Sequence, residues 1–373
     1  MTGFSSDLAS LQPWRSKPSV AWAREGLGLY GWGEAVRFDP GTGSGRFDQA
    51  LQAVRATPGG IGLAAFTFDE EEAGSVVIVP KVLVEIRDTG KRLVLGDPAD
   101  IPQEGESEPM PRGTQEVENG EAWTSTVASA MAAIESGEVE KVVVSRTVAL
   151  TFESAVPMAA VAERLTRSEL GSHTFMIDGL VGSSPELLVS KHGASVRSLS
   201  LAGSADGASP MASTSLSSPK MGIEHGLAAD SVEEALAPFC LTLSRAPTTV
   251  KSYADISHLA TAFVGEAVPG TRVTDLAAAL HPTAAVAGTP TKAAIELIRE
   301  VESHGRGRYA GPVGWISADG DGEFAIALRC GEIRGSEVVL HTGVGLVAGS
   351  DPVAEYEETR IKLRPMMRAL GVT

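Results

Sequence analysis

The strongest fold signal in this chain lies between Tyr309 and Leu370, which read YAGPVGWISADGDGEFAIALRCGEIRGSEVVLHTGVGLVAGSDPVAEYEETRIKLRPMMRAL. Three β-like runs follow one another there, at 314–317, 323–333 and 337–342. The turns DGDG and RGS separate them, and glycine-bearing turns between short apolar runs are typical of antiparallel meanders. Asp351-Pro352 then predicts the start of a helix, because proline is favoured in a first helical turn.

Two features of this stretch suit an anionic ligand. Alternation along the middle run places Arg329 on the same face as Ala325 and Ala327, and these small neighbours leave room for a carboxylate beside the guanidinium. An arginine on a solvated sheet face has the same pattern, so both interpretations stay open here. The glycines Gly343 and Gly345 would let a small anion approach backbone N–H groups.

The last helix carries a polar stripe. Glu355, Glu358 and Lys362 fall at i, i+3 and i+7, so their side chains share one face. From the helix alone, an i,i+4 surface pair between Glu358 and Lys362 is the simpler interpretation.

Composition limits the possible functions. The chain has 373 residues, of which 43% are apolar and 21% charged, so it can bury a large core. Its formal net charge of −16 makes nucleic acids and anionic membranes poor partners. An anionic substrate would need a locally positive or metal-filled site. Two cysteines, no apolar run of about 18 residues and no signal-peptide pattern lead us to expect a cytoplasmic protein without a membrane span.

The chain divides into segments of different character. Residues 1–19 are expected to form an N-terminal arm, and 20–96 mix short strands with one helix at 47–57 and show no catalytic constellation. A linker-like loop is expected at 97–120, because Pro, Gly and acidic residues are frequent there. Further helices are expected at 124–135, 157–168, 222–237, 275–280 and 291–303, strands at 61–68, 75–84, 140–152, 174–178 and 250–264, and little regular structure at 204–219.

Polar residues at the ends of these elements are candidates for chemistry. Lys141 opens an apolar strand, where a solvated lysine is the commoner case. Glu186 follows a proline and leads into an apolar run, so burial could raise its pKa toward neutrality, although a solvated acid is again commoner. Glu224 lies in a first helical turn and could simply complement the helix dipole.

Ordered sequence blocks carry a family resemblance. They are KVVVSR at 141–146, SSPELL at 183–188, SLAGS at 200–204, EH at 224–225, HPTAAVAGTP at 281–290, RYAGPVGW at 308–315, ALRC at 327–330, TGVGLV at 342–347 and EYEETRIKL at 355–363. Together they closely resemble the chorismate-utilising enzymes, the family of isochorismate synthase, salicylate synthase and anthranilate synthase component I. Residues 20–96 resemble this family more loosely, chiefly in PGGIGLAAFTFD at 58–69.

The resemblance implies a fold and a reaction. The fold would be α+β, with large antiparallel sheets packed together, helices outside, and one intertwined domain at 20–373 whose motif-bearing part is 121–373. In this family a lysine at the position of Lys141, with alanine at that of Ala202, implies water addition without covalent catalysis. We therefore expect an isochorismate synthase, with Lys141 as the base and Glu186 as the acid that releases the C4 hydroxyl.

The resemblance also implies a ligand set. Mg²⁺ would be held by three carboxylates: Glu224, Glu355 and Glu358. Chorismate would contact the following residues: Ala202, Gly203, Ser204, His281, Tyr309, Arg329, Gly343, Gly345 and Lys362. A monomer is implied, with no glutamine amidotransferase subunit, since water is the nucleophile.

One segment departs from the family pattern. At 205–223 an arginine-rich turn is replaced by Ala205-Asp206-Gly207, and the residues before Glu224 differ from the usual Lys-Asp. We expect weaker metal binding or slower turnover as a result. Two alternatives stay open: a salicylate synthase, which would also eliminate pyruvate, and a degenerate protein that binds chorismate without turning it over. Menaquinone and siderophore biosynthesis are both possible pathways.

Overall fold

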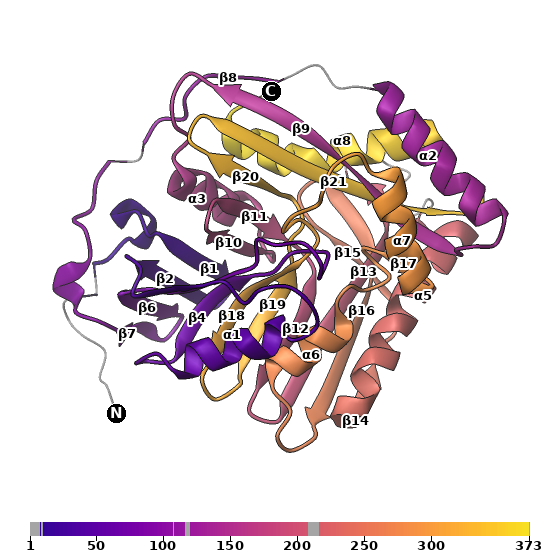
Figure 1. The fold of residues 1–373 in the computed structure, drawn as a ribbon. Coiled ribbons are helices and arrows are strands. Elements are labelled where there is room, and N and C mark those ends of the chain that lie inside the picture. Colours follow the sequence, from indigo (N-terminus) through magenta and orange to yellow (C-terminus); the bar gives the residue numbers. More distant parts are fainter. Residues whose placement is uncertain (1–7, 9, 107, 116–119, 208–215, 373) are drawn as a thin grey trace.

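The computed structural model describes residues 8, 10–106, 108–115, 120–207 and 216–372. Two large antiparallel sheets dominate it (Figure 1), one of eleven and one of ten described strands. The eleven-stranded sheet runs in the order β17 (Gly288–Thr289), β9 (Lys141–Phe152), β21 (Glu337–Val347), β20 (Cys330–Arg334), β11 (Leu180–Ser184), β10 (His173–Ile177), β1 (Val20–Arg24), β2 (Leu27–Trp32), β6 (Val82–Arg87) and β7 (Gly90–Leu95), with β8 (Gly113–Gln115) on β9.

The ten-stranded sheet lies beside it. Its order is β14 (Cys240–Arg245), β16 (Ile256–Ala267), β13 (Ser195–Asp206), β12 (Leu187–His192), β19 (Gly322–Ile326), β18 (Pro312–Ser317), β4 (Ile61–Ala65), β5 (Val76–Val79) and β3 (Val36–Phe38), with β15 (Thr249–Ser252) on β16. Both sheets combine strands from 20–96 with strands from later in the chain. The two halves of the chain are therefore interleaved. The expected boundaries at 19, 96 and 120 stay a prediction.

Helices cover the outside of the sheets (Figure 1). They are α1 (Arg46–Arg55), α2 (Gly120–Glu135), α3 (Met158–Ser168), α5 (Pro219–Leu236), α6 (Val273–Leu280), α7 (Thr291–Val301) and α8 (Pro352–Leu370), with short 3₁₀ turns η2 (Pro13–Ser16), η3 (Pro98–Asp100) and η4 (Ala237–Phe239). The expected helices are thus confirmed to within a few residues. The α8 start is also as expected, since the Asp351 carboxylate accepts the N–H of Val353 at 3.1 Å.

Apolar residues from both sheets form the main core. Its largest fully buried side chains include Trp22, Phe66, Phe175, Phe263 and Phe324, which come from strands or strand ends of either sheet. Interlocking aromatic and β-branched side chains hold the sheets together through the burial of apolar surface. No helix in the described part of the chain is long and apolar enough to cross a membrane.

The run 323–333 was expected to be one strand, but it forms two. β19 belongs to the ten-stranded sheet and β20 to the eleven-stranded sheet, so the chain crosses between sheets at 327–329. Arg329 has φ of 48°, a left-handed conformation that is uncommon for a residue other than glycine. Apolar alternation continues on both sides of this crossing, which explains why the sequence pattern hides it.

Other expectations need correction as well. The strand expected at 75–84 is divided between β5 of the ten-stranded sheet and β6 of the eleven-stranded sheet. β21 continues to Val347, so Gly343 and Gly345 lie inside a strand that pairs with β9 and not in a connecting loop. The run 250–264 is a hairpin of β15 and β16. β13 extends to Asp206, into the stretch expected to be irregular, of which 208–215 lie outside the described residues.

Candidate active site

One pocket lies where the chain crosses between the sheets. Glu186 is at the crossing from β11 to β12, and Arg329 at the crossing from β19 to β20. The N–H of Ile326 donates to the carbonyl oxygen of Glu186 at 3.1 Å, which ties the two crossings together. The pocket contains about 720 Å³ of empty space, including its opening to solvent. Ten expected site residues line it: Glu186, Ala202, Gly203, Ser204, Glu224, Tyr309, Arg329, Gly343, Gly345 and Lys362.

Lys141 is fully buried behind this lining. Its strand, β9, runs between β17 and β21, and its side chain is 0% exposed. The ammonium nitrogen lies 3.6 Å from Oε1 of Glu224, beyond hydrogen-bond length, and has no hydrogen-bond partner among the described residues. Burial lowers the pKa of Lys141, and this effect exceeds the opposing attraction of Glu224. A lowered pKa favours the neutral amine, which is the form of lysine that can act as a base.

Two glycines leave space for these side chains. A Cβ on Gly345 would lie 2.5 Å from Oε1 of Glu224 and 3.1 Å from Cε of Lys141. A Cβ on Gly343 would lie 2.9 Å from the hydroxyl of Tyr309. All three distances are shorter than ordinary van der Waals contact, so β21 needs glycine at these positions to let polar side chains approach its backbone.

Glu186 has the opposite shift to Lys141. Its side chain is buried, and burial raises its pKa from 4.5 to about 7. The N–H of Leu201 donates to its Oε1 at 3.2 Å, and the nearby charges of Lys141 and Lys362 also favour the carboxylate, but burial dominates. Glu186 is therefore partly protonated at neutral pH and can donate a proton.

Arg329 is held by a histidine that was not expected in the site. Its Nη2 donates to Nε2 of His258 at 2.7 Å, and Nδ1 of His258 lies 3.1 Å from the hydroxyl of Ser204. Burial and the charge of Arg329 keep the pKa of His258 well below its usual value, so the imidazole is neutral and can accept. Nη1 of Arg329 has no partner among the described residues and remains available for a ligand.

A second histidine, His341, was also missed. It lines the pocket and stacks on Tyr309, with ring centroids 5.2 Å apart and an interplanar angle of 16°. Burial lowers the pKa of His341 to about 3, so this ring is neutral as well. The only sequence signals for either histidine are polar rings inside apolar strands, and such residues are more often structural.

Lys362 on α8 is both part of an i,i+4 ion pair and a residue of the pocket. Its Nζ pairs with Glu358 at 2.7 Å, as an i,i+4 pair should, and also donates to the carbonyl oxygen of Gly343 at 3.0 Å. Lys362 lines the same pocket as Arg329, so the pocket contains two cationic side chains that could bind an anionic substrate.

The three carboxylates expected to hold a metal ion each face a lysine: Glu224 with Lys141 at 3.6 Å, Glu355 with Lys220 at 2.5 Å and Glu358 with Lys362 at 2.7 Å. Among the described residues no three His, Cys, Asp or Glu side chains form a ready metal group, so this trio is not preformed. Burial and the charge of Glu358 raise the pKa of Glu355. Carboxylate oxygens are the donors that Mg²⁺ prefers, so these residues fit the ion chemically, and a bound ion would take the place of a lysine contact.

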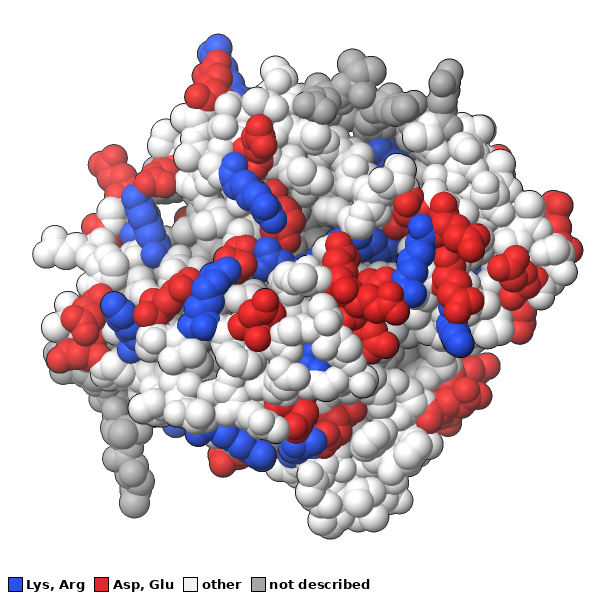
Figure 2. Space-filling view, viewed as in Figure 1, with Lys and Arg blue, Asp and Glu red and all other residues white. Residues whose placement is uncertain are grey.

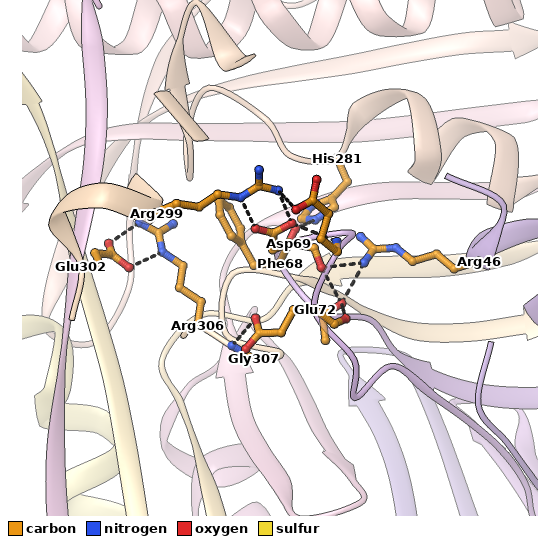
Figure 3. Close-up of polar contacts among 11 residues, drawn as sticks. Arg46, Phe68, Asp69, Glu72, His281, Arg299, Glu302, Arg306 and Gly307 are labelled. Atoms are coloured by element: carbon orange, nitrogen blue, oxygen red, sulfur yellow. Dashed lines mark hydrogen bonds and ion pairs between the residues drawn. The ribbon is translucent and has the colours of Figure 1, made fainter. Parts of the chain in front are cut away.

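His281 was expected to contact the substrate, but like Glu355 and Glu358 it does not line the pocket. Figure 3 shows it beside Phe68. Its Nε2 lies 2.9 Å from the carbonyl oxygen of Phe68, and it is not among the residues that line the pocket. Ala285 and Val286, a few residues along the same segment, line the pocket in its place. The sequence block was informative, but the direction of this side chain depends on contacts with the N-terminal half.

Comparisons with known proteins agree with this geometry. Residues 80–371 match a family model described as chorismate binding enzyme. Isochorismate synthase DhbC of Bacillus subtilis is 38% identical over 272 residues, which are 68% of either protein. Isochorismate synthase MenF of Bacillus subtilis is 35% identical over 261 residues, which span 67% of this chain but only 55% of MenF.

Solved structures extend the likeness over the whole fold. DhbC from Bacillus anthracis superposes with a TM-score of 0.84 at 27% identity, covering 98% of this chain and 99% of that one. Anthranilate synthase component I from Streptococcus pneumoniae has a TM-score of 0.75 at 18% identity and covers 93% of each chain, which supports the fold alone. The expected α+β fold and family resemblance are confirmed: the chain belongs to the chorismate-binding enzymes.

Proposed function

We propose that this protein is an isochorismate synthase, which adds water at C2 of chorismate and removes the hydroxyl at C4. The observation that carries the proposal is a pair of opposite pKa shifts at one pocket. Burial lowers the pKa of Lys141 and raises that of Glu186. Acid–base catalysis needs a base whose pKa is lowered and an acid whose pKa is raised, and this pocket has one of each.

Each proton has a defined place in this reaction. Neutral Lys141 takes a proton from water as its oxygen bonds to C2. The ring double bonds shift, and the C4 hydroxyl leaves as water with the proton of Glu186. The reaction consumes and releases one water, so it is an isomerisation. Lys141 and Glu186 then return to their starting states by exchanging protons with solvent.

The two substrate carboxylates would be bound by different groups. The unpartnered Nη1 of Arg329 and the ammonium of Lys362 are suited to the enolpyruvyl carboxylate. We propose that Mg²⁺ binds near Glu224 with help from Glu355 and Glu358. When bound, the ion would neutralise these carboxylates and hold the ring carboxylate of chorismate.

We further propose that this protein is cytoplasmic and acts as a monomer. We expect it to have no nucleic acid, membrane or amidotransferase partner. The net charge of −16 supports the exclusion of nucleic acid. On the face drawn in Figure 2, acidic and basic side chains are interspersed, and acidic ones gather around the region of α7. The product would feed menaquinone or siderophore biosynthesis.

The test is product analysis by chromatography after incubation of the purified protein with chorismate and Mg²⁺. Isochorismate without pyruvate is the expected result. Salicylate with an equal amount of pyruvate would instead make the protein a salicylate synthase. Chorismate that binds, as measured by calorimetry, but stays unchanged would contradict the proposal and favour a protein that only binds it.

A further inference from the structure

The edge of β9 that faces away from β21 has strand partners only at its ends in the described residues. β17 pairs with Lys141 and Val142, and β8 pairs with β9 from Leu150 onward. Between these contacts no described strand pairs with this edge. Its buried backbone groups need other partners, because an unpaired buried N–H or carbonyl is costly. This gap begins two residues after the proposed catalytic base.

Two side chains fill part of the gap. Oε1 of Glu302 accepts the N–H of Ser145 at 2.7 Å, and Nη2 of Arg306 donates to the carbonyl oxygen of Val143 at 2.7 Å. Nη1 of Arg306 donates to the carbonyl oxygen of Val286 at 2.8 Å. Val286 lies on the segment that leads into β17. Arg306 therefore links this segment to the edge of β9, the strand that carries Lys141.

Glu302 and Arg306 are also bonded to each other. Nε of Arg306 donates to Oε2 of Glu302 at 3.0 Å, and Nη2 donates to Oε1 at 2.6 Å (Figure 3). Each side chain is only 2% exposed. A buried bidentate pair with its remaining groups satisfied is rigid, because neither partner can leave without exposing an unpaired charge to the core.

Arg306 lines the substrate pocket, so its charge alone would suggest that it binds a substrate carboxylate. Its contacts indicate otherwise. Four of its five N–H groups already point to Glu302, Val143 and Val286. Arg329 differs, because its Nη1 has no partner among the described residues. The pocket therefore contains one arginine committed to the protein and one available to a ligand.

The N-terminal half supports this pair. The N–H of Phe68 donates to the carbonyl oxygen of Gly307 at 2.8 Å, and the N–H of Gly307 donates to Oε2 of Glu72 at 3.1 Å. The guanidinium of Arg306 lies 4.3 Å from the centroid of the Phe68 ring, and Figure 3 shows these groups together. The turn at 66–72 thus fixes the loop that follows Glu302.

We propose that Glu302 and Arg306 are positioning residues, which hold the edge of β9 so that Lys141 keeps its place beside the pocket. The proposal rests on the proposed function only in taking Lys141 as the base. In this proposal Arg306 affects turnover by positioning Lys141 and does not bind the substrate.

Two conservative variants test it. Arg306→Lys keeps the charge but cannot reach three acceptors at once, and Glu302→Gln keeps an acceptor for Ser145 but loses the ion pair. In both, we expect kcat to fall about 10- to 100-fold, since small misplacements of a catalytic group have effects of that size. KM should stay within about twofold, because neither side chain contacts substrate. If Glu302→Gln does not fold, Arg306→Lys still tests the proposal.

Two further arginines serve as controls. Arg299 lies on α7 and pairs with Asp69 at 2.6 Å, and its side chain is 39% exposed. It belongs to the same cluster in Figure 3 but none of its described contacts reaches β9. Arg299→Lys keeps a cation beside Asp69 and should therefore leave kcat unchanged. Arg329→Lys should instead raise KM, as expected for an arginine that binds substrate.

A second readout needs no turnover. Hydrogen exchange followed by mass spectrometry should show faster exchange of the Ser145 amide in Glu302→Gln than in the wild type, because the glutamine oxygen is no longer fixed by the ion pair with Arg306. Exchange in Arg299→Lys should be unchanged. A raised KM with unchanged kcat in Arg306→Lys would overturn the proposal and make Arg306 a substrate ligand. Unchanged exchange at Ser145 would overturn it too. Absence of product from the wild type would refute the proposed function alone, because the exchange result would still stand.

Discussion

The ammonium nitrogen of Lys141 lies 3.6 Å from a carboxylate oxygen of Glu224, and both side chains lie against the face of Gly345 where a Cβ would be. Replacing Gly345 by alanine should push these groups apart, since the added carbon would lie 2.5 Å from the Glu224 oxygen. We expect kcat to fall at least tenfold in steady-state assays. Gly226→Ala, in the open on α5, should keep full activity and gain about 0.5–1 kcal/mol of stability. Equal activities in the two variants would contradict this packing argument.

Lys141→Ala should remove the base while leaving the substrate contacts in place. We expect turnover to fall by about 10²- to 10⁴-fold, the usual contribution of general base catalysis, with chorismate still bound in calorimetry. Lys191→Ala is a matched control, because Lys191 is also a buried lysine but pairs with Asp321 away from the pocket. It should lower stability and spare turnover. A Lys141→Ala enzyme with near-normal kcat would show that another group is the base.

Glu186 should make stability depend on pH in an unusual direction. Its pKa is about 7 in the folded chain and near 4.5 without burial, so folding takes up a proton between these values. The free energy of unfolding should therefore fall as pH rises from about 4.5 to 7. Glu186→Gln should abolish turnover yet gain on the order of 3 kcal/mol relative to the wild type at pH 8, and little at pH 4. Denaturant titrations across this range check it, and a gain independent of pH would disprove the assignment.

Arg329 should act mainly on substrate binding. Arg329→Gln removes a charge-assisted hydrogen bond, and such bonds contribute about 1.5–3 kcal/mol. We expect KM for chorismate to rise about 10- to 100-fold, with a smaller change in kcat. Initial rates over a wide range of chorismate concentrations measure both constants. An unchanged KM would mean that the free Nη1 does not face the substrate.

Magnesium dependence should reveal the role of Lys220. This lysine pairs with Glu355 at 2.5 Å and must be displaced if a cation is to use that carboxylate. Chelation with EDTA should stop turnover, and added Mg²⁺ should restore it. In Lys220→Met, half-maximal activity should need severalfold less Mg²⁺, whereas Lys292→Met, on the exposed face of α7, should behave like the wild type. A higher Mg²⁺ requirement in Lys220→Met would show that the lysine assists the metal site.

Much of the site could be predicted from the sequence because ordered motifs fall on regular elements. β9 and α8 were expected nearly at their observed bounds, and they carry Lys141 and Lys362. The crossing at 327–329 could not be predicted, because apolar alternation is the same on both sides of Arg329 although the two strands join different sheets. Side-chain direction was also hidden: His281 turns to Phe68, a partner 213 positions away in the sequence.

The histidines of the pocket and the carboxylates of the expected metal site show a further limit of prediction from the sequence. His258 and His341 reach the pocket only through pairing of strands distant in sequence, which no local pattern encodes. The sequence placed Glu355 and Glu358 on one helical face, and this is correct. Their pairing with lysines, in place of a preformed metal group, depends on how α5 and α8 pack beside β13 and β21.

The central claim is that a solvent water, deprotonated by Lys141, becomes the new hydroxyl of the product. Glu186 protonates the C4 hydroxyl as it leaves. Its most direct test is turnover of chorismate in H₂¹⁸O with mass spectrometry of the isochorismate formed. The account predicts one ¹⁸O atom in the product, located at C2, from the first turnover onward. Unlabelled isochorismate would contradict it, because the C4 oxygen would then have moved within the substrate without any water being added.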